Sequence, residues 1–388
     1  MKYFFVLGNH PALSVAELYS RLPIITGSYL RPDIFLAEVK ESINSEQFLE
    51  TIGGTIKIGK IITTIENKPH TVFTTSLDFL RDYPKQGKFN FGLSSYGKLR
   101  MDTKSVGLAL KQALKNEDIS CRFVVSKEKT LSSVVVEQNK LISSGRELVY
   151  IGDGNEVMIG ATEAVQPFKK LSERDYGRPA RDDRSGMLPP KLAQMMINIA
   201  GSKQHESVLD PFCGSGTVLT EALLMGYTKI FGSDISPKAI EDSRHNIRWT
   251  KDMYRLHTNP ELQVIDVRQL TRNFKRDSVC AIVTETYLGP QRGVIDIQKV
   301  SRELGALYNR ALQEIFLILK KGGRAVIALP AFMSNGRPKL LDLNIGKFKT
   351  VEIIPRNLDI HLGITTRNSF VYGRDDQKVW REIIILEK

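Results

Sequence analysis

The sequence predicts an α/β protein whose C-terminal half is a doubly wound, mainly parallel sheet, preceded by smaller α+β parts. From about residue 206, short apolar runs alternate with helical stretches, as in successive strand–helix–strand units. The first of these runs ends in an acid and a Gly-x-Gly turn, and open α/β sheets bind their ligands beside such turns. Before residue 166 the strands and helices lack this regular alternation, which favours separate α+β parts.

The composition is that of a globular chain with an excess of basic residues. Its 388 residues suit two or three domains, and the net charge of +12 favours a polyanionic partner. No run approaches the ~18 apolar residues of a membrane span, so we expect no membrane association. The three cysteines have neither zinc nor disulfide spacing, and the six histidines form no cluster. We therefore expect a cytoplasmic protein without a bound metal.

Residues 1–60 are expected to fold as a small α+β domain. An apolar strand over 3–7, too short for a secretory signal, precedes a Ser-x-x-Glu capping box that predicts a helix opening at Ser14. A strand near 34–39 and a helix over 44–52 follow.

Residues 61–166 form the second predicted domain, followed by a linker over 167–188. We expect a helix near 103–116 and strands over 71–75, 121–125, 131–137, 147–151 and 156–161. In the linker, arginines are balanced by acids, which fits either a solvated segment or an ordered crossing segment.

The third predicted domain, residues 189–388, has the most regular pattern. Pro189-Pro190 opens a helix, and a longer helix with apolar residues over 304–319 ends at Gly322-Gly323. The expected parallel strands are 207–209, 230–232, 263–265, 279–283 and 325–329. Two last strands, near 350–354 and 380–386, would close the sheet as an antiparallel edge.

Acidic residues follow the first three of these strands. Asp210 opens the run Asp-Pro-Phe-Cys-Gly-Ser-Gly-Thr, whose glycines allow the backbone and its free N–H groups to approach a ligand. Asp234, 24 residues further on, ends the second strand, where a carboxylate can hold two ribose hydroxyls. Asp266 follows the third strand and could accept a hydrogen bond from an adenine amine. No phosphate-binding lysine loop is present, which indicates a nucleoside without a triphosphate.

These motifs resemble those of class I S-adenosylmethionine-dependent methyltransferases, and the Asp210 loop resembles the branch that methylates exocyclic amines of bases. The segments 174–181 and 186–198 resemble those of THUMP-domain tRNA guanosine-N2 methyltransferases, the family acting on guanosine ten of tRNA. The resemblance rests on specific motifs over about 165–388 and on layout alone before that. It implies a ferredoxin-like domain over 1–60, a THUMP RNA-binding domain over 61–166 and a Rossmann-like methyltransferase domain over 189–388.

The same resemblance implies S-adenosylmethionine as cofactor and tRNA as partner. The oligomeric state stays open, with a monomer favoured. The segment before the third domain would lie against the methionine end of the cofactor. The implied cofactor-binding residues are Gly186, Leu188, Asp210, Phe212, Gly214, Gly216, Thr217, Asp234, Ile235, Asp266 and Val267.

The fourth strand departs from the family's Asp-Pro-Pro-Tyr pattern, because this chain reads Thr-Glu-Thr-Tyr over 284–287. Glu285 could accept a hydrogen bond from the target amine, together with backbone carbonyls near Thr284, and Tyr287 could stack on the base. The loss of both prolines removes a rigid turn. The sequence therefore allows either a working variant or a site with altered specificity or no activity.

Basic residues between 81 and 129 are candidates for RNA contacts. Basic side chains can pair with phosphates, and the interleaved aromatics (Tyr83, Phe89, Phe91 and Tyr96) can stack on unpaired bases. The alternative is a solvated helix with its aromatics buried in the domain. The predicted RNA-binding residues are Lys85, Lys88, Lys98, Arg100, Lys104, Lys111, Lys127 and Lys129.

Two other functions stay open at this point. A DNA methyltransferase acting on adenine N6 or cytosine N4 shares the Asp-Pro-Phe-Cys-Gly-Ser-Gly-Thr loop. A non-catalytic RNA-binding protein would keep the fold and carry a degenerate turn on the fourth strand.

Overall fold

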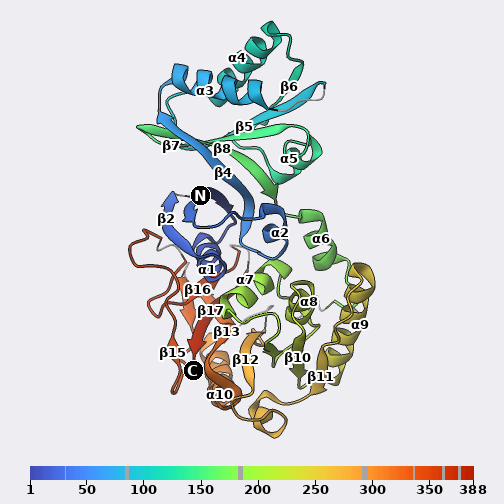
Figure 1. The fold of residues 1–388 in the computed structure, drawn as a ribbon. Coiled ribbons are helices and arrows are strands. Elements are labelled where there is room, and N and C mark those ends of the chain that lie inside the picture. Colours follow the sequence, from blue (N-terminus) through green and yellow to red (C-terminus); the bar gives the residue numbers. More distant parts are fainter. Residues whose placement is uncertain are drawn as a thin grey trace. The chain divides into compact units, whose positions relative to one another are not determined.

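The computed structural model describes residues 1–30, 32–83, 87–181, 187–290, 296–334, 337–360, 363–374 and 377–388. The chain forms two compact units (Figure 1). Unit 1 consists of Met1–Asn9, Pro23–Glu50 and Thr55–Phe168, and unit 2 of His10–Leu22, Thr51–Gly54 and Lys169–Lys388. The N-terminal part of the chain therefore contributes two short segments to the unit that holds the C-terminal half.

Unit 1 is built on one eight-stranded sheet in the order β2-β3-β1-β4-β8-β7-β5-β6. Its central strand β4 crosses residue 60, where the sequence predicts a domain boundary, so both sides of that boundary share a sheet. The strands β5, β6 and β7 pair in parallel, and the other pairs are antiparallel. The strands are β1 (Lys2–Leu7), β2 (Ile24–Leu30), β3 (Ile34–Val39), β4 (Thr55–Glu66), β5 (Phe89–Lys98), β6 (Cys121–Val124), β7 (Arg146–Asp153) and β8 (Glu156–Val165).

Two strands predicted in unit 1 are wrong, because both segments are helical. The unit's helices are α2 (Ser45–Glu50), α3 (Pro69–Asp82), α4 (Thr103–Asn116) and α5 (Ser133–Gln138). The predicted strand 71–75 lies in α3, which starts at Pro69 and buries Val72, Ser76 and Leu80 at four-residue spacing. The predicted strand 131–137 lies mostly in α5, whose first turn is capped by Ser132 accepting from the Val135 N–H at 3.3 Å. Both segments are rich in β-branched residues, whose preference for strands led to the wrong prediction.

The strand β5 was not predicted from the sequence, because its buried positions include polar residues. Ser94 donates to Glu147 at 2.5 Å, and Lys57 pairs with the same carboxylate at 2.7 Å. Thr162 completes the set with a bond of 2.6 Å to the other carboxylate oxygen of Glu147. All four side chains are buried, and their mutual hydrogen bonds offset the cost of burying polar groups.

The first helix of the chain begins earlier than predicted and belongs to unit 2. Helix α1 (Pro11–Arg21) starts at Pro11, whose ring presets the helical backbone angle, and Ser14 is an interior residue that donates to the His10 carbonyl at 3.0 Å. The predicted capping box is therefore wrong. Glu17 instead accepts from the N–H groups of Gly53 at 2.9 Å and Gly54 at 2.8 Å.

Unit 2 confirms the predicted doubly wound sheet. The strand order is β11-β10-β9-β12-β13-β17-β15, with β11 to β13 parallel and β17 antiparallel to both of its neighbours (Figure 1). The strands are β9 (Ser207–Asp210), β10 (Lys229–Asp234), β11 (Glu261–Val264), β12 (Val279–Glu285), β13 (Leu319–Ser334), β14 (Arg337–Leu340), β15 (Lys349–Thr350), β16 (Phe370–Tyr372) and β17 (Val379–Glu387). Gly322 and Gly323 lie inside β13, because the preceding helix already ends at Ile318.

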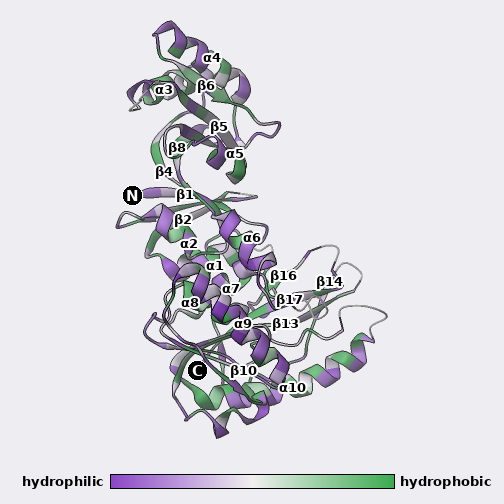
Figure 2. Cartoon of the chain, turned by 90° about the vertical axis from the view of Figure 1, so that its right-hand side faces the viewer, coloured by the Kyte–Doolittle hydropathy of each residue, from purple (hydrophilic) through white to green (hydrophobic). Residues whose placement is uncertain are grey.

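Helices cover the sheet of unit 2. They are α6 (Phe168–Tyr176), α7 (Pro190–Ala200), α8 (Thr217–Leu224), α9 (Pro237–Tyr254) and α10 (Ile297–Ile318), with the short 3₁₀ helix η1 (Val267–Arg272). α7 packs on β12 and β13, α9 packs on β10 and β11, and α10 packs on β13 and η1. Hydrophobic and hydrophilic segments alternate along α10 (Figure 2), and its apolar face joins the largest buried cluster. The predicted linker is in part the helix α6, so this stretch is ordered.

Within the described ranges, no helix is both long and apolar enough to cross a lipid bilayer.

Glu17 makes the stability of unit 2 depend on pH. It is fully buried, and burial raises the pKa of its carboxyl from 4.5 to about 7, against the opposing effect of the Gly53, Gly54 and Asn198 donors. The folded protein therefore keeps this proton between about pH 4.5 and pH 7, where the unfolded chain has released it. We expect the melting temperature of the natural protein to fall over that window relative to that of Glu17→Gln, measured by calorimetry. Parallel curves for the two proteins would contradict this assignment.

Candidate active site

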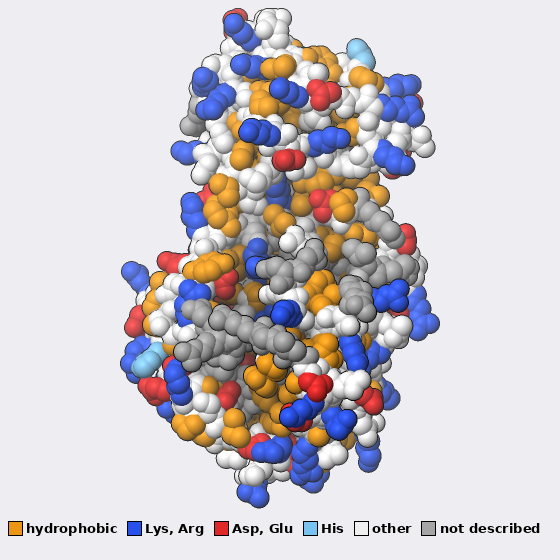
Figure 3. Space-filling view, turned by 180° about the vertical axis from the view of Figure 1, so that it is seen from behind, with side chains coloured by type: hydrophobic (Ala, Val, Ile, Leu, Met, Phe, Trp, Pro, Cys, Tyr) orange, Lys and Arg blue, Asp and Glu red, His pale blue; other side chains and the backbone are white. Residues whose placement is uncertain are grey.

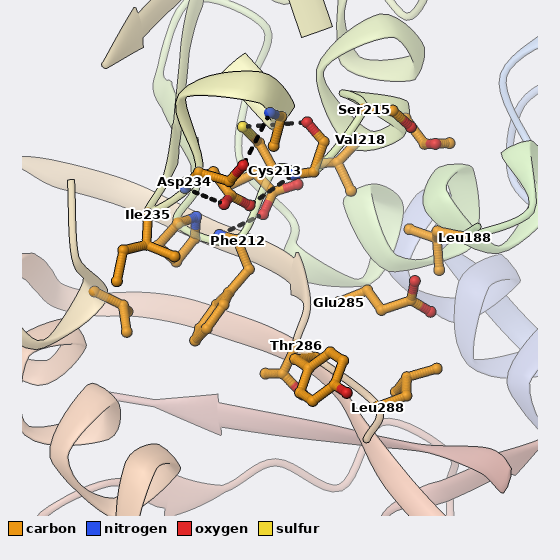
Figure 4. A pocket seen from close by; sticks show the side chains of 18 of the residues that line it. Leu188, Phe212, Cys213, Ser215, Val218, Asp234, Ile235, Glu285, Thr286 and Leu288 are labelled. Atoms are coloured by element: carbon orange, nitrogen blue, oxygen red, sulfur yellow. Dashed lines mark hydrogen bonds between the residues drawn. The ribbon is translucent and has the colours of Figure 1, made fainter. Parts of the chain in front are cut away.

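A cavity of about 740 Å³ opens at the carboxyl ends of β9, β10 and β12 in unit 2 (Figure 4). This is the edge where open α/β sheets bind their ligands. It is lined by Met187, Leu188, Asp210, Pro211, Phe212, Cys213, Gly214, Ser215, Thr217, Val218, Asp234, Ile235, Ser236, Ala239, Asp266, Val267, Arg268, Glu285, Thr286, Tyr287, Leu288 and Leu307.

The Gly-x-Gly loop is held against β10 by backbone and carboxylate hydrogen bonds. The Cys213 N–H donates to the Ser233 carbonyl at 2.9 Å, and the Gly214 N–H donates to Asp234 Oδ2 at 3.1 Å. Gly214 and Gly216 have φ angles of +52° and +85°, in the left-handed region that favours glycine. Gly214 faces the open pocket, whereas Gly216 lies behind it, where an added Cβ would come within 2.8 Å of Ser243 Oγ.

Asp234 is oriented by backbone donors on both carboxylate oxygens. Oδ2 accepts from Gly214, and Oδ1 accepts from the Ser236 N–H at 2.9 Å. Each oxygen retains a second lone pair for a ligand hydroxyl. The neighbouring Ile235 is 64% exposed and, with Val267, forms an apolar wall of the same pocket. A carboxylate beside an apolar wall offers acceptors for the ribose hydroxyls and a surface for the base, which is the combination that a nucleoside requires.

Asp210 is the most deeply buried acid of the site. Thr284 Oγ1 donates to it at 2.6 Å, and the Phe212 N–H donates at 3.1 Å. Burial raises the pKa of its carboxyl to about 8, with Asp234 and Glu285 adding to the rise. Asp210 therefore connects the ends of β9 and β12 largely without contributing a full negative charge to the pocket at neutral pH.

Asp266 is already engaged by a side chain that the sequence did not single out. The Arg268 guanidinium binds both carboxylate oxygens, with Nε at 2.9 and 3.0 Å and Nη2 at 2.5 Å. This partner lowers the pKa of the Asp266 carboxyl. An adenine amine would have to share these oxygens with Arg268, which itself lines the pocket.

The turn after β12 lacks the two prolines and is held by hydrogen bonds instead. Thr286 donates to the Ala328 carbonyl through its N–H at 2.9 Å and through its hydroxyl at 3.1 Å. The buried Tyr308 donates its hydroxyl to the Tyr287 carbonyl. Gly289, at φ +80°, then redirects the chain. Hydrogen bonds to β13 and α10 thus fix the geometry that proline rings fix in the family pattern.

Glu285 lies at the end of β12 and is paired with a buried arginine. Arg381, on β17, donates through Nε to Glu285 Oε1, and its Nη2 donates to the Met187 carbonyl at 3.2 Å. The exposed fractions of the two side chains are 14% and 6%. In Figure 4 the Glu285 carboxylate points toward Leu188, across the pocket from the Gly-x-Gly loop.

Most of the predicted site residues line this pocket, with three exceptions. The Thr284 side chain is fully buried and reaches Asp210 rather than the cavity. Gly216 lies behind the loop, and Gly186 is outside the described residues. Tyr287 lines the pocket with 53% of its surface exposed, so its ring is accessible to a base.

Sequence reasoning missed Arg381, Tyr308 and Arg268. Arg381 and Tyr308 act on the turn from 96 and 21 residues away. A signal for Arg381 exists, since Arg381-Glu382 interrupts an otherwise apolar strand. A buried charged pair in such a strand needs a partner.

The described residues contain no group of three or more His, Cys, Asp or Glu side chains that could hold a metal ion. The Cys213 thiol is buried, and burial raises its pKa well above the usual value. A nucleophile needs the opposite shift, so Cys213 serves as a packed loop residue.

The mainly parallel sheet of unit 2, with its antiparallel edge and a pocket at the carboxyl ends of its strands, has the layout typical of class I methyltransferase domains. Residues 178–335 match the family profile described as UPF0020, RMKL-like, methyltransferase domain. The chain is also related in sequence to tRNA (guanine(10)-N2)-dimethyltransferases.

It is 34% identical to the enzyme of Methanothermobacter thermautotrophicus over 148 residues, which cover 38% of this chain and 40% of the relative. It is 30% identical to that of Pyrococcus abyssi over 225 residues, or 55% and 60% of the two chains. The chain thus spans about half the length of the curated relatives it matches. The crystal structure of TrmN from Thermus thermophilus matches over 100% of both chains, with a TM-score of 0.55 and 17% identity, which shows a shared fold.

Removing the Tyr308 hydroxyl should loosen the turn without emptying the pocket. In Tyr308→Phe the Tyr287 carbonyl loses its donor, and a displacement of the turn by ~1 Å can cost up to ~100-fold in rate. If the pocket catalyses methyl transfer, we expect kcat to fall about tenfold or more, with cofactor affinity unchanged. Tyr227→Phe is the matched control, because this buried hydroxyl bonds the Ser202 carbonyl at 2.8 Å away from the pocket lining. Equal kcat values for the two variants would refute the role of Tyr308.

Proposed function

We propose that this protein transfers a methyl group from S-adenosylmethionine to the exocyclic N2 amine of a guanosine in tRNA. The observation that carries the proposal is a carboxylate, Glu285, at the end of β12 and in one pocket with the Gly-x-Gly loop and Asp234. The relatedness to tRNA (guanine(10)-N2)-dimethyltransferases supports guanosine in tRNA as the substrate, with position ten by analogy. A tRNA substrate also implies a cytoplasmic location.

The residues of the pocket fit the proposed cofactor. Asp234 would bind the ribose hydroxyls, and Ile235 and Val267 would pack on the adenine ring. Leu188 and the loop residues Phe212, Gly214 and Thr217 would surround the methionine part, while Gly216 shapes the loop from behind. When bound, S-adenosylmethionine supplies an electrophilic methyl group on a sulfonium.

The chain's own residues would then prepare the amine for attack. Glu285 accepts a hydrogen bond from the amine, which orients the nitrogen lone pair, and the exposed Tyr287 ring stacks on the base. The base must leave its stack for its edge to enter a pocket of this kind. No strong base is needed, because the proton can leave after methyl transfer. The buried Thr284 supports this arrangement through Asp210 rather than through contact with the substrate.

Unit 1 offers a basic groove that suits the RNA backbone. A cavity of about 710 Å³ lies between the end of β5, the start of α4 and the segment after β6. Five of the predicted RNA-binding residues line it and are exposed, namely Lys98, Arg100, Lys104, Lys127 and Lys129. Lys88 and Lys111 are exposed outside its lining, and Lys85 is outside the described residues. Figure 3 shows Lys and Arg side chains spread over the end of unit 1 that carries α3 and α4.

The aromatic residues predicted to stack on bases do not reach this groove. Phe89, Phe91 and Tyr96 are buried, and Tyr83 packs against Phe89 with ring centroids 6.2 Å apart. Electrostatic contacts to phosphates therefore carry the proposed binding of RNA by unit 1.

The proposed function is tested by methyl transfer from isotopically labelled S-adenosylmethionine to unmodified total tRNA, with the nucleosides identified by mass spectrometry. We expect labelled N2-methylguanosine. Labelled N6-methyladenine or N4-methylcytosine in duplex DNA would instead support a DNA methyltransferase. Cofactor binding with no label in any nucleoside would support a non-catalytic RNA-binding protein.

Asp234→Ala should weaken binding of S-adenosylhomocysteine by about 1–3 kcal/mol, since it removes a charge-assisted contact. Unchanged binding would contradict the assignment of Asp234 to the cofactor.

Neutralising the groove should weaken tRNA binding in a salt-dependent way. Each phosphate contact contributes a slope of about 0.7–0.9 to the dependence of log affinity on log salt. For Lys98→Ala/Lys127→Ala/Lys129→Ala we expect about tenfold weaker binding near ~0.1 M salt and a shallower slope, measured by filter binding. Lys40→Ala is the control, an exposed lysine just after β3, near the other edge of the same sheet. An unchanged slope in the triple variant would exclude this groove.

A further inference from the structure

The pairing of Glu285 with Arg381 bears on which base the pocket accepts. Arg381 lies on β17, two strands away from β12, and its guanidinium extends past β13 to reach Glu285 Oε1. Its second contact, to the Met187 carbonyl, ties β17 to the segment Met187–Leu188, which also lines the pocket. One buried side chain thus holds both Glu285 and a neighbouring part of the pocket lining.

An ionised glutamate can only accept hydrogen bonds. Guanine presents two adjacent donors beside its reactive nitrogen, the N1–H and the N2 amine. Adenine and cytosine instead present a ring nitrogen with a lone pair next to their exocyclic amine. A carboxylate can therefore accept from both donors of guanine, whereas it meets a lone pair on each of the other two bases.

We propose that Glu285, held in place by Arg381, selects guanine by accepting from both N1–H and N2–H of the base. This inference rests on the proposed function and names its specificity-determining contact. Glu285 touches the substrate, and Arg381 is a positioning residue that acts through it. Sites built around a buried hydrogen-bonding group reject analogues that cannot satisfy it far more strongly than apolar pockets do.

Arg381 also explains how a glutamate, Glu285, can stand where the family pattern has the shorter aspartate. Glutamate has one more rotatable bond than the aspartate of the family pattern, and its carboxylate would otherwise sample several positions. The Arg381 guanidinium binds Oε1, and an ion pair of which 6% and 14% of the two side chains are exposed favours the rotamer that keeps this contact. The ion pair therefore restores the precision that the additional methylene would remove.

The test compares guanosine with 2-aminopurine riboside at the methylated position of an otherwise identical tRNA. 2-Aminopurine keeps the C2 amine, but its N1 carries a lone pair in place of a proton. We expect the natural protein to show a kcat/KM at least about 100-fold lower for 2-aminopurine. In Glu285→Gln the amide can donate to the unprotonated N1 while its oxygen accepts from the amine. The ratio of guanine to 2-aminopurine should then fall toward one or invert.

Arg381→Met should lower the same ratio at least about tenfold, and Arg381→Lys should recover part of it. Arg367→Met is the matched control, because Arg367 pairs with the buried Glu382 of β17 outside the pocket lining. Its ratio should equal that of the natural protein. If Arg367→Met does not fold, Arg324→Met serves as the control, because it breaks the Arg324–Glu387 pair between β13 and β17.

Equal kcat/KM values of the natural protein for the two bases would overturn the proposal, as would an unchanged ratio in Glu285→Gln. Both results leave N2 methylation of guanosine intact. A failure of the proposed function is recognised separately, because the natural protein would then label neither substrate.

Discussion

The hydrogen bond from Thr284 to Asp210 joins the two halves of the site. Asp210 begins the loop that shapes the proposed cofactor pocket, and Thr284 precedes the turn that carries Glu285. Both residues are buried at the ends of neighbouring strands, and the raised pKa of Asp210 reduces the cost of enclosing an acid there. Any shift between β9 and β12 would separate the loop from the turn, so the register of these strands sets the distance between the two proposed reactants.

The turn at the end of β12 illustrates how one geometry can be produced by different means. Proline rings restrict a turn through covalent structure, and the restriction is local. Here Thr286, Tyr308 and Arg381 impose it through contacts with β13, α10 and β17. The geometry of the site consequently depends on how β13, α10 and β17 pack around the turn.

Features with a local cause were predicted from the sequence. The strand ends at Asp210 and Asp234 and the glycine loop between them follow from periodicity and turn chemistry, and the structure confirms them. Strands were predicted within α3 and α5, because the β-branched residues there favour strands. Both segments are helical, since a proline begins α3 and a serine caps the first turn of α5. Arg381 and Tyr308 could not be assigned, since their roles depend on partners brought close only by the fold.

The membership of α1 in unit 2 affects the order in which the protein can fold during synthesis. Glu17 leaves the ribosome long before Asn198 of α7, which donates to it at 2.7 Å across 181 residues of chain. Until α7 is made, α1 lacks the helix against which it packs, so the contacts between these two helices form only after the intervening chain has been synthesised. A fragment beginning at residue 169 would lack α1 altogether and would leave its contact surface on α7 uncovered.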